Sequence, residues 1–367
     1  MKKYGICNIF FLSNIGTVNL SSLIDYIIII LGGITLKKLI NQPENVVEEM
    51  LSGIVLAHPE YVRKLNGYNV LVRKNSPIAG KVALVSGGGS GHEPAHGGYV
   101  GKGMLDGAVA GDVFTSPTPD PIYEAIKAVD GGAGVLLIVK NYTGDIMNFE
   151  MAKEMAEMEL IKVDYVVVND DVAVENSTYT AGRRGIAGTV FVHKIAGAKA
   201  ETGASLEEVK ETALKVIDNV RSMGMALTPC IVPAAGKANF TLAENEMEIG
   251  MGIHGEPGTH RDTLKIADEV TEHLVGRILE DLKLQAGEEV AVMVNGLAST
   301  PLMELYIINK KVNDILWEKG VKIYKTLVGE FMTSLEMAGC SISILRLDEE
   351  LKTLLDMAAD TPAYKSL

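Results

Sequence analysis

Three buried strand patterns, alternating with helical patterns, constrain the fold of this chain most. Gly134–Lys140 (GVLLIVK) and Lys162–Val168 (KVDYVVV) are rich in aliphatic residues and resemble strands that are covered on both faces. Lys81–Ser86 (KVALVS) is a third, shorter strand of this kind. Helical patterns occur at Pro121–Val129 and Asn148–Glu159. This alternation predicts an α/β fold built from βαβ units, with a mostly parallel sheet and helices on both faces.

The second half of the chain predicts a smaller α/β (α+β) domain. A long charged helix is expected at Ser205–Ser222, and we place the domain boundary near its end, giving domains at 36–222 and 223–367. After the boundary the patterns predict helices at Arg261–Leu282 and Pro301–Glu318 and strands at Glu289–Asn295 and Val321–Val328.

Residues 1–35 differ in composition from the rest of the chain. They carry only two lysines and one aspartate, and their apolar stretches are interrupted by Asn8, Ser13 and Asp25. The uninterrupted part is shorter than the roughly 20 residues that a membrane span needs, and no convincing cleavage site marks a secretory signal. Leu31–Ile34 can be encoded by DNA that contains a ribosome-binding sequence, and Leu36 can be encoded by TTG, a permitted bacterial start codon. We therefore expect the native protein to begin at Leu36, with a surface tail as the alternative.

The charge balance excludes several classes of partner. There are 34 Lys and Arg against 47 Asp and Glu, which gives a formal net charge of −13, and no run of basic residues interrupts this excess. A surface of this kind is poorly suited to nucleic acid or to an anionic membrane. The three cysteines are far apart, which fits a reducing cytoplasm better than a disulfide framework or a zinc site.

A glycine-rich segment, Gly87–Pro94 (GGGSGHEP), directly follows the first strand and is interpreted as a turn before a helix. Backbone amides in such a segment can approach an oxygen-rich ligand. The segment lacks the Gly-Lys-Ser/Thr of a P-loop and the spacing of a dinucleotide fingerprint, so nucleotide binding by this chain is weakly supported. A tight turn with no ligand is the structural alternative.

Polar residues near the predicted strand ends are candidates for acid–base chemistry. Lys140 and Asp145 follow the second strand, where ligands commonly lie in parallel sheets, although an ordinary solvated loop is an equal alternative. His92 can serve as a general base beside the glycines. His92 to His96 also matches H-E-x-x-H, but Pro94 disfavours the helix that a zinc site of this type needs, and we predict no metal. His254 lies among four glycines, which favours a reactive over a structural imidazole.

Taken together, these segments resemble the K subunit of dihydroxyacetone kinase. The resemblance runs from Leu36 to Leu367, in one order. Its motifs are Gly87–Pro94, Asp112–Pro119 (DVFTSPTP), Val139–Asp145 (VKNYTGD), Asn169–Val174 (NDDVAV), Tyr179–Gly185 (YTAGRRG), Val232–Gly236 (VPAAG), Gly252–Gly258 (GIHGEPG), Asn295–Leu302 (NGLASTPL) and Phe331–Gly339 (FMTSLEMAG).

The resemblance implies a role for each candidate residue. His254 matches the histidine that forms a covalent hemiaminal with the ketone carbonyl of dihydroxyacetone. His92 and Asp145 match the base and proton-handling pair. The substrate contacts of the family fall on Lys140 and on the segment Gly89, Ser90 and Gly91.

The resemblance also implies the reaction and its partners. It predicts a phosphoenolpyruvate–glycerone phosphotransferase, in which an L subunit carrying ADP and magnesium is recharged by a phosphocarrier M subunit. No cofactor is then expected on this chain, because the nucleotide-binding L domain that follows in ATP-dependent relatives is not found here. The family implies a homodimer. A non-catalytic co-activator that binds dihydroxyacetone, and an enzyme that uses ATP directly, remain as alternatives.

Overall fold

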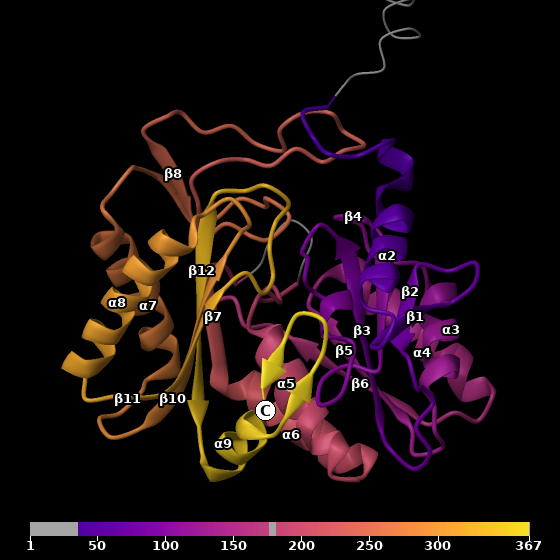
Figure 1. Cartoon of the computed structure of the whole chain (residues 1–367). Coiled ribbons are helices and arrows are strands. Elements are labelled where there is room, and N and C mark those ends of the chain that lie inside the picture. The colour runs from indigo at the N-terminus through magenta and orange to yellow at the C-terminus, as the bar shows by residue number, and fades with distance from the viewer. Residues whose placement is uncertain (1–35, 176–180, 367) are drawn as a thin grey trace, which may run out of the picture. The chain divides into compact units, whose positions relative to one another are not determined.

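The computed structural model describes residues 36–175 and 181–366, and residues 41–367 form one compact unit (Figure 1). Residues 1–35, for which a non-native start is predicted, lie outside the described residues. So do the first two residues of the Tyr179–Gly185 motif.

The first sheet contains the three strands predicted from the sequence. β3 (Ala83–Ser90), β5 (Val135–Lys140) and β6 (Val163–Val168) pair in parallel, and β4 (Gly107–Val113) joins the other edge of β3 in parallel. Every residue of β5 is buried, as its aliphatic sequence predicts. Two antiparallel strands, β2 (Val70–Arg73) and β1 (Val62–Lys64), complete the order β1-β2-β4-β3-β5-β6 and were not predicted.

The second sheet is mixed, in keeping with the α+β character expected for this half. β10 and β11 are parallel and match the predicted strands, whereas the remaining pairs are antiparallel. The sheet's other strands, β7, β8, β9 and β12, were not predicted from the sequence. The order is β11 (Lys322–Gly329), β10 (Glu289–Gly296), β12 (Gly339–Leu347), β7 (Val220–Ala226), β8 (Glu246–Ile249) and β9 (His260–Thr263).

The helices form three layers around the two sheets (Figure 1). α3 (Pro119–Val129) and α4 (Thr143–Met158) cover one face of the first sheet. α7 (Ala267–Leu282) and α8 (Leu302–Glu318) cover the outer face of the second sheet. Apolar residues of α5 and α6 belong to one core with residues from both sheets, so these two helices form a shared middle layer. Their bounds are Thr189–Glu201 and Leu206–Asn219.

The central position of α5 explains its sequence. Ten consecutive residues, 189–198, are buried, so the helix presents small and apolar side chains in all directions. The sheets predicted as two domains are therefore joined through one core, while the predicted boundary near residue 222 stays a prediction.

The remaining elements are η1 (Pro43–Asn45), α2 (Val46–Ala57), η2 (Gly97–Tyr99), α9 (Glu349–Asp356), β13 (Ala359–Asp360) and β14 (Lys365–Ser366). No helix within the described ranges is long and apolar enough to cross a bilayer.

Two predictions of local structure were wrong. The glycines do not form a turn before a helix, because β3 continues to Ser90 and only the 3-10 turn η2 follows. A Cβ on Gly87 would lie 2.4 Å from the Val109 carbonyl oxygen, so glycine allows close backbone approach within the sheet. The helix expected from Arg261 begins at Ala267, because 260–263 form the edge strand β9.

Candidate functional site

Three of the predicted site residues, Gly89, Asp145 and His254, line a cleft at the carboxyl ends of the first sheet's parallel strands, whereas His92 and Lys140 are fully buried and do not line it. The cleft has a volume of about 680 Å³. Gly89 comes from β3, Asp145 from the first turn of α4, and His254 from the loop after β8 of the second sheet. The remaining lining residues are Phe114, Thr115, Ser116, Tyr142, Thr143, Gly144 and Asn148. The site therefore combines strand ends of one sheet with a loop of the other.

Glu256 orients the imidazole of His254. The carboxylate oxygen Oε1 lies 2.9 Å from His254 Nδ1, and Oε2 accepts a hydrogen bond from the His254 backbone amide at 3.0 Å. Burial alone would raise the pKa of Glu256, but the charge of His254, the hydrogen bond to it and the guanidinium of Arg184 lower the pKa to about 2. An ionised carboxylate accepts a hydrogen bond from the Nδ1–H group, which keeps the proton on Nδ1 and leaves the lone pair on Nε2.

Arg184 fastens the loop that carries His254. Its guanidinium is fully buried, pairs with Asp171 Oδ2 at 2.7 Å, and donates to the Gly250 carbonyl at 2.7 Å. It also donates to the Pro257 carbonyl at 3.4 Å. Because these carbonyls lie on either side of His254 in the chain, one side chain holds both ends of the loop.

Three aromatic rings surround His254. The ring centroids of His92 and Tyr142 lie 4.7 Å from that of His254, and the centroid of Phe114 lies 5.2 Å away, all in edge-on arrangements. Phe114 also stacks on His92 at 5.2 Å. The backbone of Phe114 has a φ of 58°, which costs a non-glycine residue on the order of 1–3 kcal/mol. Such strain is concentrated at functional sites, and here it places the ring against both histidines.

His92 is placed to accept a proton. It is fully buried, and its Nδ1 lies 2.8 Å from the Thr333 carbonyl oxygen, which can only accept, so the proton is on Nδ1. Nε2 is buried and has no hydrogen-bond partner among the described residues. Burial, and then the charges of His254 and Lys140, lower the pKa of His92 well below its usual value. His92 is therefore neutral near pH 7.

The side chains of Lys140 and Asp145 are both buried, and both lie close to Gly88. Their side chains are 0% and 3% exposed, and neither Lys140 Nζ nor Asp145 Oδ1 has a hydrogen-bond partner within the described part of the chain. Burial lowers the pKa of Lys140, and the Asp145, Glu256 and Asp170 carboxylates oppose this effect. Unpaired buried polar atoms are costly, which points to a polar ligand that supplies the missing bonds.

Gly88 leaves space for the side chains of Lys140 and Asp145, and its substitution tests their role in binding. A Cβ on Gly88 would lie 2.8 Å from Lys140 Nζ and 3.5 Å from Asp145 Oδ2, and the backbone φ is 154°. We expect Gly88→Ala to displace the ammonium and to weaken binding of dihydroxyacetone, the ligand that the sequence resemblance implies, about tenfold, because a lost hydrogen bond to a charged group costs about 1.5 kcal/mol. Calorimetric titration measures the affinity. Gly276→Ala, at an open position of α7, is the control and should retain binding. Unchanged affinity in Gly88→Ala would contradict this role.

The predicted contacts at Ser90 and Gly91 have structural partners. The Ser90 hydroxyl donates to the Gly111 carbonyl at 2.7 Å. The Gly91 amide donates to Glu93, and its carbonyl accepts a hydrogen bond from the Leu335 amide. Of the three residues in this segment, only Gly89 lines the cleft. Substrate contact by Ser90 and Gly91 therefore stays a prediction.

Sequence reasoning missed the residues that hold the histidines. Glu256 stands two residues after His254, and this His-x-Glu spacing was a usable signal. Phe114, Arg184 and Thr333 gave no such signal, because their contacts to the site come from distant elements. Within 36–175 and 181–366 no group of three or more His, Cys, Asp or Glu is placed to hold a metal ion.

The fold and site define a class of α/β protein in which a carboxylate-oriented histidine, a neutral histidine, a buried lysine and a buried aspartate meet between two sheets. The family model for the Dak1 domain matches residues 52–363. The chain therefore belongs to the Dak1 domain family, which confirms the resemblance found in the sequence motifs.

Curated relatives and solved structures agree with this family. The chain is 56% identical to the dihydroxyacetone-binding subunit of PTS-dependent dihydroxyacetone kinase 1 from Listeria innocua, over 90% of this chain and 100% of that one. It is 46% identical to the corresponding PEP-dependent subunit from Escherichia coli, over 89% and 99%. The dihydroxyacetone kinase of C. freundii superposes with a TM-score of 0.83 at 36% identity, covering 90% of this chain and 61% of that one. The co-activator DhaQ superposes with a TM-score of 0.82 at 36% identity, over 87% and 98%.

Proposed function

We propose that this chain is the dihydroxyacetone-binding subunit of a phosphotransferase-dependent kinase, and that it holds its substrate as a hemiaminal on His254. The observation that carries the proposal is the contact between Glu256 Oε1 and His254 Nδ1, which leaves Nε2 as a nucleophile. The relatives supply the substrate, because their names describe dihydroxyacetone-binding subunits.

The first step is addition of His254 to the ketone. Nε2 donates its electron pair to the carbonyl carbon, and the π electrons of the C=O bond move to the oxygen. Glu256 takes the Nδ1 proton and passes it to solvent, and the alkoxide oxygen takes one proton from solvent water, so that the hemiaminal is neutral and no net proton is gained or lost. The buried ammonium of Lys140 is available to stabilise the developing negative charge.

The second step is phosphorylation of a terminal hydroxyl. The adduct fixes the substrate, which makes the transfer effectively unimolecular. Asp145 takes the proton of the attacking hydroxyl, and neutral His92 assists through Nε2. We assign the phosphoryl donor to a nucleotide-bearing L subunit, recharged by an M subunit from phosphoenolpyruvate. Magnesium and nucleotide would then belong to that partner.

Covalent binding explains selectivity. Dihydroxyacetone and glycerol have nearly the same size, and packing alone distinguishes such pairs by about 1–3 kcal/mol. Addition to a carbonyl is open to ketones and aldehydes and closed to polyols.

A reconstituted assay tests this function. The purified chain is supplied with dihydroxyacetone and either ATP alone or L and M subunits with a phosphoenolpyruvate-charged relay. Dihydroxyacetone phosphate formed only with the relay supports the proposal. Tight dihydroxyacetone binding without product would favour a co-activator like DhaQ, and product from ATP alone would favour direct use of the nucleotide. His92 and Asp145 are both present, which favours the kinase.

Glu256→Gln tests how His254 is activated. A neutral amide accepts the Nδ1 proton more weakly than a carboxylate, so we expect about tenfold less adduct at equal dihydroxyacetone concentration. Intact-protein mass spectrometry after trapping measures the adduct. Glu244→Gln, at an exposed position, is the control.

The same variant has an expected pH dependence. Because the pKa of Glu256 is about 2 in the folded protein and ordinarily 4.5, its ionisation stabilises the fold above pH 4.5, and this stabilisation is lost as the pH falls towards 2. The difference in unfolding free energy between wild type and Glu256→Gln should therefore shrink from pH 5 to pH 3 in urea titrations. A constant difference would contradict the assignment.

A further inference from the structure

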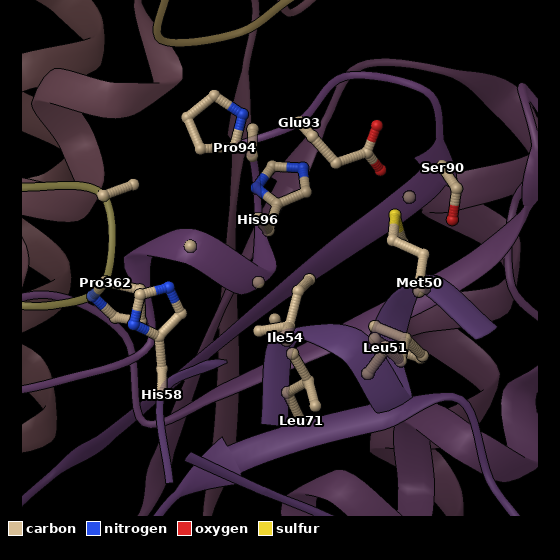
Figure 2. Close-up of a pocket in the computed structure, with 18 of the residues that line it drawn as sticks. Met50, Leu51, Ile54, His58, Leu71, Ser90, Glu93, Pro94, His96 and Pro362 are labelled. Carbon is tan, nitrogen blue, oxygen red and sulfur yellow. The ribbon is translucent and has the colours of Figure 1, made fainter. Parts of the chain in front are cut away.

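A second cavity, of about 260 Å³, lies against the glycine strand (Figure 2). One side is apolar and is formed by Met50, Leu51 and Ile54 of α2 together with Leu71 of β2. Figure 2 shows Glu93 and His96 across the cavity from Ile54 and Leu71. The cavity is therefore amphipathic, with a polar end and an apolar body.

Both titratable groups at the polar end offer acceptors. Glu93 Oε1 accepts a hydrogen bond from the Gly91 amide at 3.1 Å, which leaves Oε2 for another donor. His96 is 6% exposed, and its Nδ1 lies 2.9 Å from Nε2 of buried His193. His96 Nε2 is buried and has no hydrogen-bond partner among the residues described.

The surroundings of His96 determine which nitrogen carries the proton. The Ser86 hydroxyl donates to the Ile138 carbonyl at 2.7 Å, so it faces His96 Nδ1, 3.5 Å away, as an acceptor. An acceptor at this position favours the proton of His96 on Nδ1 and the lone pair on Nε2. Burial, followed by the ammonium of Lys140, lowers the pKa of His96 well below its usual value, so the ring stays neutral. Glu93 and His96 thus present acceptors without a matching donor.

We propose that this cavity binds a small amphiphilic cation, with an ammonium or guanidinium head that donates to Glu93 Oε2 and His96 Nε2. The aliphatic part of the ligand then packs among Met50, Ile54 and Leu71. A head with several N–H donors satisfies two acceptors at once, and its charge is matched by the carboxylate. Desolvation raises the pKa of Glu93, and a bound cation would offset that unfavourable burial.

The position of the cavity couples it to the cleft. Gly89 lines both cavities, and Glu93 holds the amide of Gly91, next to His92. A ligand that attracts the Glu93 carboxylate alters this hydrogen bond and hence the segment beside the substrate. Binding at the two sites must then be reciprocal in free energy. This coupling, unlike the site itself, rests on the proposed function.

Paired probes test the site on the full chain. Calorimetry or ligand-observed NMR compares n-hexylguanidinium with n-hexylurea, which has the same shape without the charge. We expect saturable binding of hexylguanidinium, about tenfold tighter than hexylurea, because charge-assisted hydrogen bonds are about twice as strong as neutral ones. Glu93→Gln should remove this preference. Ala110→Leu, which fills part of the apolar body, should weaken both probes.

The possible outcomes distinguish the cation site itself from its coupling to the substrate cleft. Equal binding of the two probes, equal binding to wild type and Glu93→Gln, or no saturable binding would each overturn the cavity as a cation site. Thermal unfolding of both variants shows that they are folded. Dihydroxyacetone affinity is then measured with and without saturating hexylguanidinium, and an unchanged value overturns the coupling. Failure of the proposed function is distinguished by absent dihydroxyacetone binding when no probe is added.

Discussion

His254→Ala is expected to abolish the covalent adduct and to remove the exclusion of glycerol. Without Nε2 the substrate is held by packing and hydrogen bonds alone, so kcat/KM for dihydroxyacetone in the reconstituted relay should fall on the order of 10³-fold or more. The preference for dihydroxyacetone over glycerol should drop to about 10–200-fold, the range that packing provides. Mass spectrometry measures the adduct, and competition with glycerol measures the selectivity.

His260→Ala is the matched control for this variant, because His260 is an exposed histidine on the nearby edge strand β9. It should keep both the adduct and the selectivity. If His254→Ala still formed an adduct or still excluded glycerol, the hemiaminal proposal would be wrong, even if the chain proved to be a kinase subunit.

Asp145→Asn is expected to separate binding from catalysis. The amide cannot accept the proton of the attacking hydroxyl, so kcat should fall about 10²–10⁴-fold, the range for a general base. The adduct on His254 should persist, because it does not require Asp145 to take that proton. Single-turnover transfer from a charged L subunit measures the chemical step, and mass spectrometry measures the adduct in the same sample.

Asp120→Asn is the control, since Asp120 is likewise in the first turn of a helix that covers this sheet but is exposed. It should transfer at the wild-type rate. Equal loss of adduct and transfer in Asp145→Asn would show that Asp145 binds the substrate rather than acting as a base.

Local sequence patterns were sufficient to predict the parallel strands β3, β5 and β6 of the first sheet. β5 is buried at every residue and nearly all aliphatic, and β6 is rich in valine although Asp164 and Tyr165 are only partly buried, so both strands are recognisable from their sequences. The same reasoning failed for β9, where His260–Thr263 is polar and exposed and its pairing with β8 decides its conformation. It also failed for β12, whose seven-residue pairing with β7 joins segments more than 100 residues apart.

In the candidate site, too, local motifs predicted some residues, whereas the residues that depend on tertiary contacts were missed. His254, His92, Lys140 and Asp145 were identified from motifs, and the structure places them around one cleft. The residues that tune them depend on tertiary contacts: the Thr333 carbonyl fixes the proton of His92 from 241 positions away. The spacing of residues along the chain gives no indication of such a contact.

The shared middle layer of α5 and α6 has a consequence for how the site works. His254 belongs to a loop of the second sheet, whereas Asp145 starts a helix on the first, and both sheets are packed against the same two helices. A hinge between the sheets would have to separate α5 from apolar neighbours that bury it completely. The proposed nucleophile and the proposed base are thus held at a fixed spacing from the moment the chain folds. Entry of the ketone and approach of the donor must therefore be accommodated by surface loops rather than by closure of two lobes.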